Sequence, residues 1–255
     1  MRTGRKNLSM LVLVIILIVS AAGIFTFSSC QTIEQVRSYI GYNLEREADS
    51  GDINSGLSSL EGEEIILPEP NLDSDFSLVE ALEKRRSVRN FSGRELGLDQ
   101  ISQILWAAQG ITQKATGHRT APSAGALYPL ELFLVKSDGT YHYQPEEHKL
   151  AKLLSGDLRE KLAEGSLFQG FIAIAPASIV ITAVYERTTI KYGDRGIRYV
   201  NMEAGHCCQN ILLQSVALGL GAVSVGAFDD DYIQNLFNLP SDYRVLYVIP
   251  VGYPE

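Results

Sequence analysis

The sequence predicts an α+β domain over residues 76–255, preceded by an apolar N-terminal segment and an acidic linker. Residues 8–27 are almost purely apolar, and residues 43–75 carry ten acidic side chains against one arginine, Arg46. From residue 76 onward, helical periodicity and short apolar runs follow one another without regular β-α-β alternation, which favours an α+β arrangement. An apolar content of 45% is ordinary for a chain with a real interior.

The N-terminal segment fits two interpretations. Leu8–Phe27 follows a short basic stretch and is long enough to span a bilayer. It is either a retained signal anchor or the apolar part of a signal cleaved before Cys30, because Phe27-Ser-Ser-Cys30 loosely resembles a lipobox. Residues 1–30 are therefore expected to tether the protein to the membrane, as a transmembrane anchor or as a lipoprotein. The domain is expected to be extracytoplasmic, because the basic flank stays inside.

The charge and cysteine content of the chain argue against several classes of function and site. Residues 31–75 are predicted to be an acidic linker that holds the domain off the membrane. The chain has 22 basic and 30 acidic residues, a balance that argues against nonspecific nucleic-acid binding. Cys30, Cys207 and Cys208 form no C-x-x-C motif, so neither a disulfide framework nor a zinc site is expected.

Periodicity and turn residues place the elements of the domain. Helices are predicted over Ser77–Arg86 with Ser77 as N-cap, Leu98–Gln109, Leu150–Glu164 in two pieces, and Asp194–Leu218. Strands are predicted over Leu130–Lys136, Gly139–Tyr143, Ser178–Val184, Ala222–Gly226 and Tyr243–Val251. Two loops are predicted, Gly110–Leu127 and Tyr185–Tyr199.

Three segments far apart in the chain carry chemical information. Arg85-Arg86-Ser87-Val88-Arg89 places three guanidinium groups and a hydroxyl within five residues, a set of donors that suits a phosphate group. Ala217–Gly226 is typical of a helix that runs through glycines into an apolar strand, where bare backbone can approach a flat ligand. Between them, Ala121–Pro129 contains a Pro-Ser-Ala-Gly turn. Each segment alone also has an ordinary structural explanation.

Taken in this order, the three segments resemble the nitroreductase family of flavoproteins, and within it they look most like the azoline-oxidising SagB-type dehydrogenases. The resemblance covers roughly residues 76–255. It implies a nitroreductase-like fold, with a mixed central sheet flanked by helices, FMN as cofactor, and a homodimer that binds FMN at the subunit interface. FMN is expected rather than FAD because the sequence has no G-x-G-x-x-G dinucleotide fingerprint.

The resemblance implies the cofactor contacts residue by residue. Arg85 and Ser87 would bind the FMN phosphate with Arg86 assisting, and Arg89 would reach the pyrimidine edge of the ring. A fixed cation at that edge stabilises the negative charge that two-electron reduction leaves near N1 and O2.

Two further segments complete the cofactor site that the resemblance implies. The turn would lie along the flavin, where small side chains permit a close approach by Pro122, Ser123, Ala124 and Gly125. In the family, a backbone N–H at the position of Val225 and Gly226 donates to flavin N5, and this hydrogen bond steers hydride transfer.

A Lys-Tyr pair is the predicted catalytic centre. Lys191 and Tyr192 resemble the pair associated with activity in azoline dehydrogenases. Removal of a carbon-bound hydrogen as hydride requires a base for the accompanying proton, and a lysine beside a phenol can share this task. The alternative is an exposed loop with a solvated lysine.

A polar stripe marks the otherwise apolar helix of residues 194–218. Its members, at i, i+3, i+7 and i+11, are Glu203, His206, Asn210 and Gln214. A di-metal site would need a second Glu-x-x-His motif and further carboxylates, which the sequence lacks, so no metal is predicted. The stripe is expected in a buried polar network or across a two-fold subunit contact.

The predicted function is an FMN-dependent oxidoreductase that transfers hydride through flavin N5 in two half-reactions. Its substrate would be a small molecule or a peptide azoline, although SagB-type relatives work in the cytoplasm and an exported anchor does not fit that setting. An NAD(P)H-dependent nitro or quinone reductase shares the fold, and a non-catalytic binding module is the alternative of a different class. Intact flavin motifs count against the module. The resemblance implies further basic residues after the last strand that hold phosphate, and the sequence has none there. Either Arg195 or Arg198 substitutes for them or phosphate binding is weaker, and this departure counts for the module.

Overall fold

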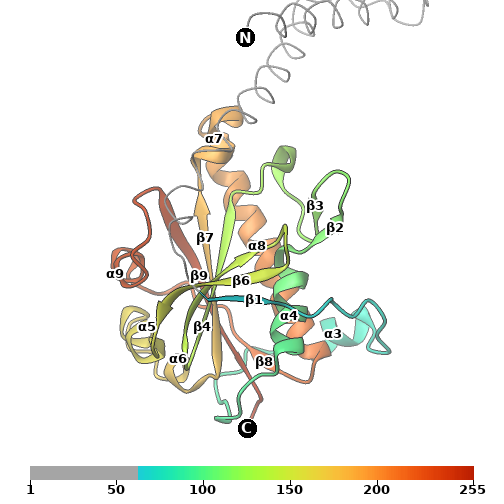
Figure 1. Ribbon diagram of the computed structural model, residues 1–255, viewed down its shortest axis with the longest axis vertical. Coiled ribbons are helices and arrows are strands. Elements are labelled where there is room, and N and C mark those ends of the chain that lie inside the picture. The colour runs from blue at the N-terminus through green and yellow to red at the C-terminus, as the bar shows by residue number, and fades with distance from the viewer. Residues whose placement is uncertain (1–62) are drawn as a thin grey trace, which may run out of the picture. The chain divides into compact units, whose positions relative to one another are not determined.

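A seven-stranded sheet organises residues 63–255, the part of the chain that this computed structural model describes (Figure 1). Its strands are β1 (Glu64–Ile66), β4 (Leu130–Lys136), β5 (Gly139–Gln144), β6 (Lys149–Ser155), β7 (Ala177–Val184), β8 (Gly221–Ala222) and β9 (Tyr243–Gly252). Their order is β1-β6-β5-β4-β7-β9-β8, and neighbouring strands pair antiparallel. A parallel bridge between Ser87 and Ala222 makes the β8 edge mixed. The short β2 (Ile111–Gln113) and β3 (His118–Arg119) form a separate hairpin.

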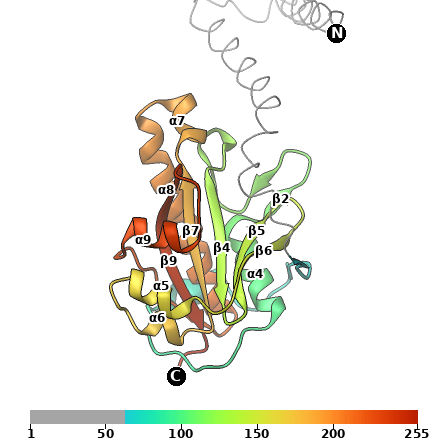
Figure 2. The same cartoon turned by 60° about the vertical axis from the view of Figure 1, so that its left-hand side comes forward.

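Helices lie on both sides of the sheet, as Figures 1 and 2 show from two directions. On one side, α4 (Leu98–Gln109) packs against the long α8 (Arg195–Ala217), which also contacts α3 (Leu78–Lys84) and α7 (Glu186–Tyr192). On the other side lie α5 (Arg159–Gly165), α6 (Phe171–Ile174) and α9 (Asp230–Leu236). This arrangement confirms the predicted α+β class.

The central strands are apolar on both faces because both faces are covered. In β4, Leu132 and Leu134 belong to the hydrophobic core that includes residues of α4 and α8. Phe133 points the other way, where its ring lies 6.0 Å from that of Phe237 and 6.4 Å from that of Tyr243. A single strand therefore joins two apolar layers.

Most predicted elements are confirmed. The helices expected over Ser77–Arg86 and Leu98–Gln109 correspond to α3 and α4, and the N–H of Glu80 donates to the hydroxyl of Ser77, the predicted N-cap. The expected long helix is α8. The predicted strands agree with β4, β5, β7 and β9 within a few residues. Of the strand predicted over Ala222–Gly226, only Ala222 lies in β8, and Val225 forms an isolated bridge to Val248.

The helix predicted over Leu150–Glu164 is wrong in its first half. Lys149–Ser155 is strand β6, which pairs with both β5 and β1, and the helix α5 starts only at Arg159. The leucines of this segment suit either structure. A tight turn returns the chain beside β5, and strand pairing then overrides the local pattern.

The loop predicted over Tyr185–Tyr199 is also wrong, and its last residues overlap the long helix that was correctly predicted to start near Asp194. It contains α7 and the start of α8, separated by Gly193 in a left-handed conformation with φ of 56°. Only Thr188 of α7 is buried. A short, largely exposed helix has no apolar stripe, so its polar and aromatic composition is typical of a loop.

The folded part begins before residue 76. β1 pairs with β6, Leu67 is buried in the core, and the Ser102 hydroxyl donates to the carbonyl oxygen of Pro68 at 2.5 Å. The described end of the predicted acidic linker, residues 63–75, therefore belongs to the domain.

The predicted N-terminal segment lies outside the described residues. Nothing in the structure bears on Leu8–Phe27 or Cys30, so the anchor and the lipoprotein both stay predictions. Within residues 63–255, no helix combines the length and the apolar composition that crossing a bilayer requires.

The predicted phosphate-binding segment is attached to the β8 edge of the sheet. The N–H of Val88 donates to the carbonyl oxygen of Ala222 at 3.1 Å. A Cβ built on Gly221 would lie 2.6 Å from the Cβ of Val88. The absence of a side chain at this glycine therefore lets the segment approach the sheet.

Replacement of Gly221 by alanine should destabilise the domain by about 1–3 kcal/mol, because the new methyl group overlaps the side chain of Val88. Gly205→Ala in α8 is the matched control. Nothing lies within 4 Å of a Cβ built there, and alanine favours a helix interior by about 0.5–1 kcal/mol. Urea unfolding of both variants provides the measurement. An equal effect of the two substitutions would contradict the close approach.

Candidate functional site

The residues of the predicted phosphate grip lie directly after α3. Arg85 is the C-cap of this helix, and the guanidinium of Arg86 donates to two carbonyl oxygens at its end, at 2.7 and 2.8 Å. Ser87 and Arg89 are exposed, and the guanidinium of Arg89 lies 5.9 Å from the ring centroid of Phe171. Arg86 thus helps to end the helix, whereas Ser87 and Arg89 are accessible to a ligand.

The two residues of the predicted N5 contact differ in their backbone bonding. The N–H of Val225 donates to the carbonyl oxygen of Val248 at 2.9 Å, so it is already used. Gly226 is exposed, and nothing lies within 4 Å of a Cβ built on it. Of this pair, Gly226 is the residue whose backbone can meet a flat ligand.

A segment that the sequence did not predict to be functional lies beside the second of these sites. Leu167 and Phe168 have left-handed backbones, with φ of 55° and 60°, and are 61% and 82% exposed. The side-chain amide of Gln169 donates to the carbonyl oxygen of Ala227 at 3.0 Å, next to Gly226. Consecutive non-glycine residues in this conformation are strained and gather at functional sites. The strain depends on backbone dihedral angles, which cannot be read from the sequence.

Lys191 and Tyr192 meet the predicted flavin turn. Gly125 lies within the 3₁₀ turn Ala124–Ala126 with φ of 66°. A Cβ built on Gly125 would lie 2.8 Å from the hydroxyl of Tyr192 and 2.9 Å from the ammonium of Lys191. The structure therefore brings together two segments separated by more than sixty residues in the sequence.

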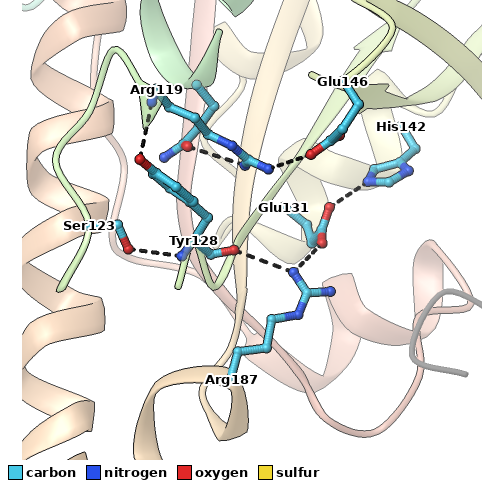
Figure 3. A network of polar contacts seen from close by, with 8 residues as sticks. Arg119, Ser123, Tyr128, Glu131, His142, Glu146 and Arg187 are labelled. Atoms are coloured by element: carbon cyan, nitrogen blue, oxygen red, sulfur yellow. Dashed lines mark hydrogen bonds and ion pairs between the residues drawn. The ribbon is translucent and has the colours of Figure 1, made fainter. Parts of the chain in front are cut away.

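Tyr128 orders the other end of this turn (Figure 3). Its N–H donates to the hydroxyl oxygen of Ser123 at 2.9 Å, and its own hydroxyl accepts the N–H of Arg119 at 3.1 Å. The guanidinium of Arg119 lies 4.6 Å from the ring centroid of Tyr128 and donates to Glu146 at 2.9 Å. These contacts hold the turn in one conformation.

A largely buried ion pair joins the start of α7 to β4, as Figure 3 also shows. Arg187 donates to Glu131 at 2.5 Å and to the carbonyl oxygen of Tyr128 at 3.5 Å, and His142 lies 2.7 Å from Glu131 on the other side. Burial raises the pKa of Glu131, but the hydrogen bond to His142 and the charge of Arg187 outweigh it and bring the pKa to about 2. Arg187 precedes Lys191 by one helical turn, so the pair attaches the helix that carries the Lys-Tyr motif to β4.

The polar stripe on α8 is partly buried, as expected. Glu203 is 2% exposed, and Asn210 donates from its side chain to the carbonyl oxygen of Ala107 in α4 at 3.0 Å. His206 is exposed. Burial raises the pKa of Glu203 to about 7, although hydrogen bonding by Ser123 and the charge of Arg119 act in the opposite direction.

The candidate residues form two groups near opposite ends of α8 (Figure 1). Lys191 and Tyr192 immediately precede this helix, whereas Arg85–Arg89 run beside β8, which follows it. A helix of 23 residues is roughly 34 Å long. Within one chain, the structure does not bring the Lys-Tyr pair to the phosphate grip.

Residues 82–253 match the family model described as the nitroreductase family. The chain belongs to the nitroreductase family. It is 46% identical over 184 residues to a protein of Methanocaldococcus jannaschii named as a nitroreductase, which covers 70% of this chain and 91% of that one. It is 28% identical over 166 residues to the microcin B17-processing protein McbC of Escherichia coli, over 57% of each chain.

Solved structures agree with this membership. A nitroreductase-like protein of Ralstonia eutropha superposes with a TM-score of 0.70 at 29% identity, covering 75% of this chain and 90% of that one. The Escherichia coli microcin synthetase complex McbBCD contains a chain with a TM-score of 0.59 at 22% identity, which supports the fold alone. The chain is accordingly a nitroreductase-family oxidoreductase; FMN is the typical cofactor of the family, and the fold is usually dimeric.

The residues present fit FMN. Ser87 and Arg89 offer an exposed hydroxyl and guanidinium at the β8 edge, a donor set that suits a phosphate or an electron-rich ring edge. Gly226 offers open backbone, and Gly125 leaves no room for a side chain between the turn and the Lys-Tyr pair. These features suit anion binding and close backbone approach, and they place an amine and a phenol side by side.

Replacement of Gly125 by alanine should impair catalysis, because the new methyl group would displace the Lys191 ammonium and the Tyr192 hydroxyl. Gly117→Ala is the matched control, since Gly117 has a similar φ of 69° but nothing within 4 Å of a built Cβ. Both variants carry backbone strain of roughly 1–2 kcal/mol. Flavin reduction by substrate, followed by stopped flow, should slow at least tenfold more in Gly125→Ala. Equal rates of flavin reduction in the two variants would show that the turn does not affect the Lys-Tyr pair.

Glu203 should make folding stability depend on pH. Its pKa of about 7 lies above the ordinary 4.5, so the unfolded chain releases this proton first as the pH rises. Stability should therefore fall through the window from 4.5 to 7, by about 3 kcal/mol in total, and Glu203→Gln should remove this part of the slope. Urea unfolding of both proteins across the window tests it; parallel curves would exclude a titrating Glu203.

Proposed function

We propose that this protein is an FMN-dependent oxidoreductase of the SagB type, which removes hydride from a substrate carbon and transfers it to flavin N5. The observation that carries this proposal is the meeting of Lys191, Tyr192 and Gly125. An ammonium and a phenol converge on the turn that the family resemblance assigns to the flavin. The similarity to the microcin B17-processing protein supports a peptide azoline as the substrate class.

The residues of the chain would divide the work by position. FMN, when bound, supplies the two-electron acceptor. Ser87 and the arginines of the phosphate grip hold the negatively charged end, and the N–H of Gly226 orients the ring. As hydride leaves one substrate carbon for the flavin, the adjacent atom of the substrate loses a proton. Lys191, acting as the uncharged amine, and Tyr192 would accept this proton. Because the flavin must be reoxidised before the next substrate reacts, the kinetics should be ping-pong.

A homodimer would reunite the two groups of candidate residues. If two copies pack with their α8 helices antiparallel, the start of one helix lies beside the end of the other. The Lys-Tyr pair of one subunit would then face the phosphate grip of its partner. Exposed apolar side chains on α3 and α8 support such a contact: Leu78, Val79, Leu82, Ile197 and Met202.

Reduction of nitro compounds or quinones with NAD(P)H is the second candidate. A relative from Methanothermobacter thermautotrophicus, named as an NADH dehydrogenase/NAD(P)H nitroreductase, is 26% identical over 185 residues. The exposed Phe168 favours it, since a flat aromatic compound can stack on an exposed ring. A non-catalytic binding module with this fold would bind flavin without turnover.

The first test is cofactor binding. The purified protein should show a flavin absorption band near one FMN per chain, and the double variant Arg85→Ala, Ser87→Ala should bind FMN ten- to a hundredfold more weakly. The loss corresponds to a charge-assisted contact of about 1.5–3 kcal/mol. Lys84→Ala is the control, because Lys84 pairs with Glu80 in the same helix. If the double variant binds FMN as tightly as wild type, the phosphate binds at another site.

The second test separates the two half-reactions. Lys191→Ala should retain FMN but slow flavin reduction by substrate by about 10²-fold, as for a positioned acid–base group. Reoxidation by a small artificial acceptor should change little. Lys114→Ala, an exposed lysine near the β2–β3 hairpin, should behave as wild type in both. Equal slowing of both half-reactions would point to a distorted cofactor site, and no slowing would exclude the lysine from catalysis.

A further inference from the structure

Glu203 is a buried carboxyl group that the proposed reaction does not use. It lies on α8 beneath the turn Pro122–Gly125 and is 2% exposed. Within residues 63–255, its Oε1 has no hydrogen-bond partner. The Nε2 of Gln109 and the Nε of Arg119 are likewise buried without hydrogen-bond partners in this part of the chain, and both side chains lower the pKa of Glu203.

The groups around Glu203 come from four elements. Gln109 ends α4, Arg119 belongs to β3, Ser123 belongs to the turn, and Cys207 lies one helical turn further along α8. Arg119 is the charged group among them, and its guanidinium also donates to Glu146 at 2.9 Å and to Gln109 at 3.4 Å.

The carboxyl group is therefore poised between its two protonation states. Burial raises its pKa to about 7, against the opposing effects of the Ser123 and Gln109 side chains and of the charge of Arg119. Burial also raises the pKa of the Cys207 thiol far above neutrality, so this thiol stays protonated and neutral. Glu203 is the group in this cluster that titrates near neutral pH.

The hydroxyl of Ser123 has a limited number of hydrogen bonds to share. It carries one proton and two acceptor sites, and the N–H of Tyr128 fills one of these at 2.9 Å. Its proton can point inward to Glu203 or outward from the turn. An ionised Glu203 only accepts, so it draws the proton inward. A protonated Glu203 can instead donate to the second acceptor site of Ser123, which frees the hydroxyl proton to point outward.

We propose that Glu203 is a positioning residue that sets the donor direction of Ser123, so that binding of an acceptor-rich ring along the turn is coupled to uptake of one proton by Glu203. This inference rests on the proposed function, in which the turn lies along FMN. The carbonyl oxygens and ring nitrogens of the isoalloxazine are acceptors that an outward hydroxyl can serve. The coupling is reversible: bound FMN favours the protonated carboxyl, and a protonated carboxyl favours bound FMN.

Proton uptake on FMN binding is the direct test. Calorimetric titration of FMN in two buffers of different ionisation enthalpy gives the number of protons exchanged per FMN. The FMN phosphate also titrates, with a second pKa of about 6, so the readout is the difference between wild type and variant. At about pH 7.5, wild type should take up about half a proton more than Glu203→Gln, because the amide cannot titrate.

Two further variants complete the test. Glu160→Gln removes an exposed carboxylate on α5, on the other side of the sheet, and it should leave the uptake at the wild-type value. Ser123→Ala should abolish the extra proton uptake although Glu203 is still present. This variant tests whether the coupling runs through the hydroxyl, and it replaces Glu203→Gln in the test if that variant does not fold. Equal uptake by wild type, Ser123→Ala and any folded Glu203→Gln would overturn the inference and leave the proposed function intact. Failure of wild type to bind FMN at any pH would overturn both.

Discussion

The burial of α8 against the sheet is the constraint on which the rest of the structure depends. This helix contacts β4, β7 and β9 and packs against α3, α4 and α7. Its inward residues Val200, Cys207 and Ile211 are completely buried, and burial of apolar surface is the dominant favourable term in folding. Each candidate segment is placed by what it meets on α8: the Lys-Tyr pair at the start, the flavin turn near Glu203, and the phosphate grip beyond the end.

Polar contacts then orient the segments that the apolar core holds in place. The Arg187–Glu131 pair is largely buried, and such pairs contribute little net stability because desolvation offsets their attraction. Its consequence here is geometric, since it ties α7 to the strand that leaves the flavin turn. Glu203 shows the opposite case. Desolvation of its carboxyl group outweighs the opposing charge of Arg119, so its pKa is raised to about 7.

Local sequence patterns predicted the elements that have a clear apolar face. Leu98–Gln109 has a clear apolar face, and the structure reproduces this helix to the residue. Strand β6 was not predicted, because the pattern of Lys149–Ser155 suits a helix as well as a strand. Its structure depends on pairing with β5 and β1. Helix α7 was not predicted, because a mostly exposed helix of seven residues has no periodic signal. The strained Leu167–Phe168 segment was invisible for a similar reason: strain is imposed by surrounding contacts.

By itself, the sequence determined the α+β class, most helices and strands, and the family, because periodicity and short motifs are local properties of the chain. Only the tertiary structure decided that Gly125 touches Lys191 and Tyr192, that the phosphate grip lies near the far end of α8, and that Glu203 is buried beneath Ser123. These outcomes depend on contacts between residues far apart in the sequence. Desolvation, which sets the protonation of a carboxyl group, exists only once such contacts exclude water.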